Sequence, residues 1–195
     1  MKLWKILLLV LFAFVVGAAT IAGDMISRGF SARTPPSQLE TVAARAMRDM
    51  AIPSAAKQAR NPFPSTAEVV AAGRAHWADH CATCHANDGS GNTEIGQNLY
   101  PKAPDMRQAA TQNLSDGELY SIIRNGVRLT GMPAWGNPNL PLDIDSWHLV
   151  TFIRHLPQIT PEEIEEMKGL NPKTEADRAE EQQEQEFLNG GGPSQ

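Results

Sequence analysis

Both cysteines of this 195-residue chain lie in one pentapeptide, Cys81-Ala-Thr-Cys84-His85, and this motif constrains the fold more than any other feature. Cys-x-x-Cys-His is the pattern that attaches c-type haem covalently. Residues at positions i, i+3 and i+4 share one face of a helix, so both thiols can reach the vinyl groups along one side of a porphyrin while the histidine reaches its iron. The motif therefore predicts one haem c, bonded through Cys81 and Cys84, with His85 as an iron ligand.

Other uses of a Cys-x-x-Cys pair fit the sequence less well. Two cysteines are too few for a four-cysteine zinc or iron–sulfur site, and no second ligand pair lies at zinc-binding spacing. No predicted strand precedes the motif, which argues against a thioredoxin-like site. A plain structural disulfide would close a small, strained loop and would leave His85 without a role.

Capping boxes and the spacing of apolar residues predict a helical chain with long loops. Helices are expected at about 38–51, 66–84, 116–125 and 144–155, and from Thr160 onward. Residues 86–113 and 127–142 are rich in glycine, asparagine and proline and are predicted to be loops. Loops longer than about 12–15 residues are uncommon unless something else organises them. We therefore expect the haem to organise this part of the chain.

The second axial ligand is predicted to be Met132, which lies 47 residues after His85 in Gly131-Met132-Pro133. The glycine lets the backbone approach the ring, and the proline stiffens the loop. A thioether opposite histidine stabilises ferrous iron and raises the reduction potential, as suits an electron carrier. Two alternatives remain: Met106, which follows another proline-rich loop, and a bis-histidine site built with His148 or His155.

Residues 66–158 resemble a class I mono-haem cytochrome c domain. The haem motif and Gly131-Met132-Pro133 are the specific parts of this resemblance. It is supported by Gly73, Trp77, Asp88-Gly89, Leu114-Ser-Asp-Gly-Glu-Leu119, Asn125-Gly126, Trp135, Trp147 and Phe152. The resemblance implies an all-α, cytochrome c-like helical bundle around a covalently bound haem, with thioether bonds at Cys81 and Cys84 and iron ligation by His85 and Met132.

The resemblance also makes two local statements. It implies that the first and last helices of the domain cross where Gly73 meets the helix of Trp147. Ala86 departs from the family, because many members have glycine directly after the ligand histidine. The departure adds one methyl group at the start of the following loop.

The chain begins with an uncharged apolar run over residues 6–23, preceded by Lys2 and Lys5. A spanning helix needs about 20 apolar residues, with about 17 as the lower limit. A signal peptide has a shorter apolar region and a small-x-small cleavage site, which Thr20-Ile21-Ala22 fits imperfectly. We predict a retained single-pass anchor, with a signal sequence as the alternative. Lysines before the run stay cytoplasmic, which predicts a haem domain in the periplasm, at a bacterial inner membrane.

The charge distribution supports a division of the chain into four parts. Residues 1–64 hold eight basic and three acidic side chains, whereas residues 161–195 hold three and ten. We expect an anchor or uncleaved signal at 1–23, a Pro/Ala-rich spacer with a short helix at 24–64, the haem domain at 65–160, and a short helix followed by an acidic disordered tail at 161–195. The net charge of −5 argues against nucleic acid as a partner.

Together these features predict a periplasm-facing, single-haem electron-transfer protein with no catalytic residues of its own. Its partners would be redox proteins or a membrane oxidoreductase complex that it supplies with electrons, and the sequence does not separate a free carrier from a subunit. The alternative is a peroxidase-like haem enzyme or a gas sensor. That alternative requires an open sixth position on the iron.

Overall fold

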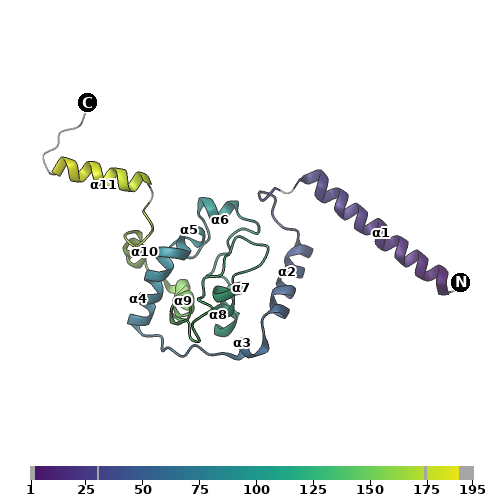
Figure 1. The fold of residues 1–195 in the computed structure, drawn as a ribbon, viewed down its shortest axis with the longest axis horizontal. Helices are drawn as coiled ribbons and strands as arrows, with labels where there is room; N and C mark the ends of the chain where they lie inside the picture. The colour runs from purple at the N-terminus through teal and green to yellow at the C-terminus, as the bar shows by residue number, and fades with distance from the viewer. Residues whose placement is uncertain (1–2, 30, 174, 189–195) are drawn as a thin grey trace. The chain divides into compact units, whose positions relative to one another are not determined.

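The computed structural model describes residues 3–29, 31–173 and 175–188. The chain divides into two compact units, Met1–Pro35 and Pro36–Gln195. Within the described ranges every regular element is helical and there is no strand (Figure 1). The predicted all-α fold is confirmed.

The first unit consists mainly of helix α1 (Leu3–Arg28). The stretch Leu3–Ser27 has a mean hydropathy of 2.7, and by length and composition it could cross a membrane. The helix continues past Asp24, where the uncharged run ends, because nothing in the following residues stops a helix. This helix fits a single-pass membrane anchor. Lys5, which precedes the apolar run, lies in this helix, whereas Lys2 lies outside the described residues.

The second unit carries all the other helices. In chain order these are α2 (Gln38–Ala51), α3 (Ser54–Gln58), α4 (Ala67–His76), the π-helical turn η1 (Trp77–Cys81), α5 (Ala82–His85), α6 (Glu94–Asn98), α7 (Ala109–Gln112), α8 (Asp116–Asn125), α9 (Ile144–His155), the 3-10 turn η2 (Leu156–Gln158), α10 (Pro161–Lys168) and α11 (Glu175–Leu188). The short helices α6 and α7 lie in the region that the sequence predicts to be loop, and they are only four or five residues long.

Helices α4 and α9 pack directly against each other, and a glycine permits the contact (Figure 1). A Cβ atom on Gly73 would lie 2.2 Å from the carbonyl oxygen of His148 and 2.9 Å from the Cβ of Phe152. Only a residue without a side chain fits at this crossing. The predicted meeting of Gly73 with the last helix is confirmed. Around the crossing lie the most deeply buried large side chains: Trp77, Leu149, Val150, Phe152, Ile153, Leu156 and Met167.

The helix predicted over residues 66–84 is divided into α4, η1 and α5. The N–H of Ala82 donates to the carbonyl of Trp77, five residues earlier, so one extra residue enters the helix at this point. Apolar spacing cannot distinguish this turn from an ordinary helical turn, which is why the sequence predicts one continuous helix. The π-helical turn ends at Cys81, the first residue of the haem motif, so the extra residue changes the direction of the motif relative to α4.

Side-chain caps define most helix starts. Ser37, Ser115 and Thr160 form complete capping boxes, as their sequences predict. Ser65-Thr66-Ala67-Glu68 also has the sequence of a capping box and predicts a cap at Ser65, but this prediction is wrong, because Thr66 caps α4 by accepting from the N–H of Val69 at 3.4 Å. The N–H of Thr66 donates to the carbonyl of Pro64, and this turn moves the helix start by one residue.

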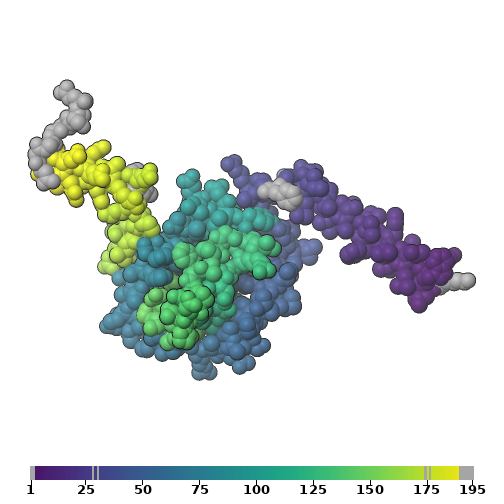
Figure 2. Space-filling model, in the orientation of Figure 1, coloured from purple at the N-terminus to yellow at the C-terminus, as the bar shows by residue number. Residues whose placement is uncertain are grey.

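The segment before the haem domain packs against it. The side chain of Asn61 donates to the Trp147 carbonyl at 3.0 Å and to the Thr151 hydroxyl at 2.9 Å. Ser115 donates its hydroxyl proton to the carbonyl of Lys57 at 2.8 Å. In the space-filling view this segment, drawn in blue, continues into the teal and green surface of the domain (Figure 2). The end of the predicted spacer, at Lys57 and Asn61, is therefore in contact with the haem domain.

The acidic segment after Pro172 is helical where the structure describes it, contrary to the prediction of disorder. Helix α11 covers Glu175–Leu188. Glutamate, glutamine and alanine are good helix formers, and the prediction from charge alone neglects this propensity. The glycine-rich end predicted to be disordered, residues 189–195, lies outside the described residues.

Candidate haem site

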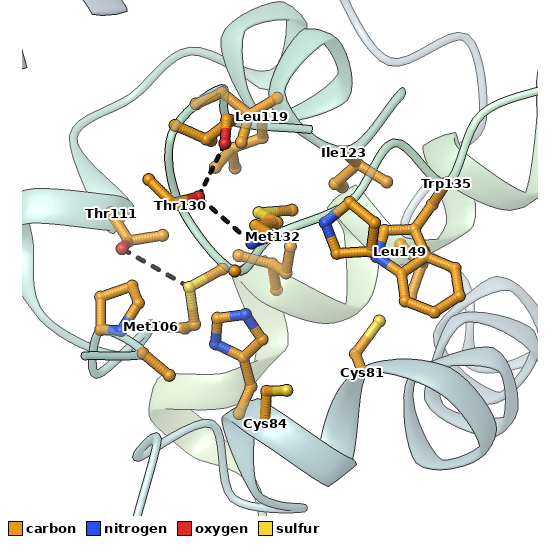
Figure 3. A pocket seen from close by; sticks show the side chains of 18 of the residues that line it. Cys81, Cys84, Met106, Thr111, Leu119, Ile123, Thr130, Met132, Trp135 and Leu149 are labelled. Carbon is orange, nitrogen blue, oxygen red and sulfur yellow. Dashed lines mark hydrogen bonds between the residues drawn. The ribbon is translucent and has the colours of Figure 1, made fainter. Parts of the chain in front are cut away.

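The haem motif and the Met132 loop meet at one cavity, although they are far apart in the sequence. Cys81, Cys84, His85 and Met132 all line it, and the cavity encloses about 1170 Å³ including the part open to solvent. Figure 3 shows the two cysteines on the helical side of the cavity, with Met132 above them in the view. The structure thus brings together all four side chains that the sequence predicts to hold the haem.

The two cysteines are presented by η1 and α5 and are not joined to each other. Both are free and half-buried. Burial raises the pKa of the Cys81 thiol to about 12, and the neighbouring Cys84 adds to the shift. A redox-active dithiol needs a lowered pKa, because the thiolate is the nucleophile. The environment of Cys81 therefore opposes the thioredoxin-like interpretation.

His85 is held as a neutral imidazole at the end of α5. Burial lowers the pKa of His85, and an interaction with the backbone of Pro104 opposes part of this shift. Its Nδ1 atom is fully covered and has no hydrogen-bond partner. A neutral imidazole is the form that binds a metal, so the electrostatics of this side chain suit ligation.

The loop that carries Met132 is fixed by its own backbone hydrogen bonds. Val127 donates its N–H to the Met132 carbonyl at 3.1 Å, and the Met132 N–H donates to the Thr130 hydroxyl at 3.1 Å. Gly126, with φ of 66°, starts the loop directly after α8. Gly131 permits a close approach of the loop to the side chain of Leu99. A Cβ atom added at Gly131 would lie 2.6 Å from the nearest atom of that side chain.

The family model described as "Cytochrome C oxidase, cbb3-type, subunit III" matches residues 68–153. This range includes the motif, the methionine loop and all but one of the residues that line the cavity. Residues 68–153 form a class I c-type cytochrome domain. No curated protein matches the chain. The cytochrome domain carries covalently bound haem c, and its chemistry is haem-based electron transfer.

The lining of the cytochrome cavity fits such a group. Most of its surface is provided by apolar side chains, including Leu119 and Ile123 of α8 and Leu149 and Ile153 of α9. The imidazole of His85 and the two free thiols, which all line the cavity, are the polar groups that a covalently bound haem requires at one side. None of the described residues that line the cavity is acidic. The residues present are therefore suitable for a large, flat, mainly apolar ligand.

Met106, the alternative ligand, also lines the cavity. Its sulfur accepts a hydrogen bond from the buried hydroxyl of Thr111 at 3.8 Å (Figure 3). Among the described residues, no hydrogen bond to the sulfur of Met132 is found. Because only Met106 uses its sulfur in a contact with the protein, the structure favours Met132.

The histidines outside the motif have other partners. His148 and His155 do not line the cavity, so the bis-histidine alternative is wrong. His148 packs edge-on against Phe63, and His155 pairs with Glu163 at 2.9 Å. His76 and His80 stack on each other with ring centroids 4.6 Å apart. Among the described residues, no group of three potential ligands that could hold a metal ion is found.

The three tryptophans of the domain divide into two groups. Trp77 and Trp135 line the cavity. The indole N–H of Trp77 donates to the carbonyl of Ala86 at 2.9 Å and so ties the cavity wall to the end of the motif. Trp147 lies in the core instead, where it stacks on Tyr120.

Ala86 occupies a backbone conformation that favours glycine, with φ of 62° and ψ of 161°. Non-glycine residues in this region carry a strain of roughly 1–3 kcal/mol. Ala86→Gly relieves the strain and also increases the entropy of the unfolded chain, which opposes part of the gain. We expect the free energy of unfolding to rise by about 1 kcal/mol, measured by thermal unfolding. A loss of stability would show that the methyl group packs usefully.

Asp105 fixes the loop before Met106. Hydrogen bonds from Arg107 lower its pKa to about 2, and Arg107 also pairs with Asp88 at 3.1 Å. A lowered folded-state pKa stabilises the fold above the unfolded-state value near 4, and this contribution disappears as the pH falls through 2. Because the pair is partly exposed, we expect Asp105→Asn to cost only about 1–2 kcal/mol at pH 7. Unfolding measured between pH 2 and 7 should show that the variant loses this acid-dependent step.

Proposed function

We propose that this protein is a periplasm-facing, single-haem electron-transfer protein whose haem is held by Cys81, Cys84, His85 and Met132. The observation that supports this most strongly is that two segments 47 residues apart supply all four side chains to one apolar cavity. The bound haem supplies a one-electron couple of iron.

The side chains of the chain have separate tasks in this proposal. The two thiols fasten the macrocycle, so that it is not lost during turnover. His85 presents a neutral imidazole from a rigid helix end, and Met132 offers a soft thioether from a hydrogen-bonded loop. The apolar walls exclude water, which limits the rearrangement that accompanies a change of charge. If His85 and Met132 both bind the iron, no position would be open to a substrate.

Redox spectroscopy of the purified protein tests this assignment. We expect pigment that resists acid–acetone extraction, a titration that fits one electron, and a weak near-infrared sulfur-to-iron band in the oxidised state. Extractable pigment would contradict attachment at the two cysteines. A high-spin spectrum that changes with carbon monoxide would favour the haem enzyme or gas sensor, because those functions need an open position.

The periplasmic location is supported by the lysines before the apolar run and by helix α1. Protease added to spheroplasts is expected to degrade the haem domain while the membrane is intact. N-terminal sequencing of the membrane fraction separates an anchor from a signal sequence. A mature start near Gly23 would contradict anchoring.

The description of the family model, a subunit of a cbb3-type oxidase, supports an oxidoreductase complex as the setting of this domain. Purification in mild detergent distinguishes the two forms of the proposal. A stable set of co-purifying redox subunits indicates an electron-entry subunit. A homogeneous protein that still exchanges electrons with membranes indicates a carrier.

A further inference from the structure

Arg48, on helix α2, reaches the cavity from outside the cytochrome domain. It is among the residues that line the cavity, yet it lies 20 residues before the range 68–153 that the family model matches. Its Nε atom is fully covered and has no hydrogen-bond partner. None of the ion pairs found among the described residues involves this guanidinium.

Contacts at both ends of α2 fix the position of Arg48. Near the start of the helix, the Tyr100 hydroxyl donates to the Glu40 carboxylate. At the other end, Asp49 pairs with Lys57 at 2.7 Å, and Ile52 is only 8% exposed. Arg48 therefore lies on a helix that is tied at its start to Tyr100 and at its end to Lys57.

The helix turns its polar side toward the domain. Thr41 and Arg48 are half-buried, while the apolar side chains Leu39, Val42, Met47 and Met50 are exposed. An amphipathic helix normally buries its apolar side. Because the orientation is reversed, we infer that Arg48 makes a polar interaction at the cavity rather than apolar packing.

The charges around the cavity are those of an anion site. The other ionisable groups that line it are Lys102, His80, His85 and the two cysteines, and none of the described lining residues is acidic. Asp49, the next residue along α2, forms its ion pair with Lys57. A covered guanidinium nitrogen without a hydrogen-bond partner is costly, and an anionic group on a ligand in the cavity would offset that cost.

We propose that Arg48 binds a propionate of the haem and so fastens α2 across the mouth of the cavity. Haem carries two propionate groups, and a guanidinium binds a carboxylate through two parallel hydrogen bonds. The proposal rests on the haem site proposed above. Reduction adds one negative charge to the haem, and a nearby cation stabilises the reduced form. Arg48 is therefore expected to raise the reduction potential.

The test compares Arg48→Gln with Arg45→Gln in the full-length haem protein in detergent. Arg45 is exposed one turn earlier on the same helix, so its removal changes the net charge equally. We expect Arg48→Gln to lower the equilibrium constant for reduction of the haem about tenfold. For one electron this is a fall of about 59 mV in the reduction potential. The Arg45 variant should change it less than threefold. The pH-dependent step of the potential that arises from the propionate should move to higher pH in Arg48→Gln alone.

The near-infrared band distinguishes a failure of the Arg48 proposal from a failure of the proposed function. If Arg48→Gln keeps the band, the native potential and the native pH-dependent step, Arg48 does not bind a propionate, while the ligation by methionine stands. If the native protein lacks the band, the proposed ligation by Met132 fails, and the potentials of the variants still report on Arg48. Arg48→Lys keeps the charge without the planar fork. We expect it to recover most of the potential, and a potential equal to that of Arg48→Gln would contradict the proposal.

Discussion

Replacing Met132 with leucine is expected to abolish the near-infrared sulfur-to-iron band and to lower the reduction potential by on the order of 0.2 V. The range that axial ligands span in haem proteins, about 0.8 V, allows an effect of this size. Leucine keeps nearly the same volume, so the loop and the cavity wall should retain their packing. The loss is then attributable to the thioether, which stabilises ferrous iron. Absorption spectra and a redox titration measure both effects.

Met106→Leu is the matched control for this prediction. Its sulfur also lines the cavity, but it accepts a hydrogen bond from Thr111. We expect this variant to keep the band and to change the potential little. Loss of the band in Met106→Leu, with Met132→Leu unaffected, would reverse the assignment of the sixth ligand. The sequence alone leaves these two methionines as alternatives.

Replacing Gly73 with valine is expected to cost about 4 kcal/mol or more of the free energy of unfolding. A Cβ atom at this position meets the backbone oxygen of His148 at 2.2 Å, and backbone cannot give way as a flexible side chain can. Helices α4 and α9 must therefore separate, which opens the core around Phe152. For a domain of this size, we expect the melting temperature to fall by about 15 °C or more.

Ala72→Val provides the comparison, because Ala72 is exposed on the same helix. A β-branched residue at an exposed helix position lowers stability by less than about 1 kcal/mol through helix propensity. Thermal unfolding of the two variants isolates the cost of the crossing. If Gly73→Val melts within a few degrees of Ala72→Val, the close contact of α4 with α9 is not a determinant of stability.

Several parts of the site could be predicted because their signals are local in the sequence. The spacing within Cys81-Ala-Thr-Cys84-His85 specifies covalent attachment of haem, and the capping boxes at Ser37 and Ser115 mark helix starts. The sequence does not single out Arg48, since Arg45, three residues earlier, lies on the same predicted helix. Only the packing of α2 on the domain distinguishes the two arginines.

The sequence by itself determined the haem chemistry, the helical fold class and an apolar segment long enough to span a membrane, because each depends on residue type and on spacing along the chain. The tertiary structure decided which methionine keeps a free sulfur, which histidines stay away from the cavity, and where the helix before the haem motif gains a residue. It also decided that the segment before the domain places a cation at the cavity. These features depend on contacts between distant residues, and the energies of such contacts leave no pattern in the sequence.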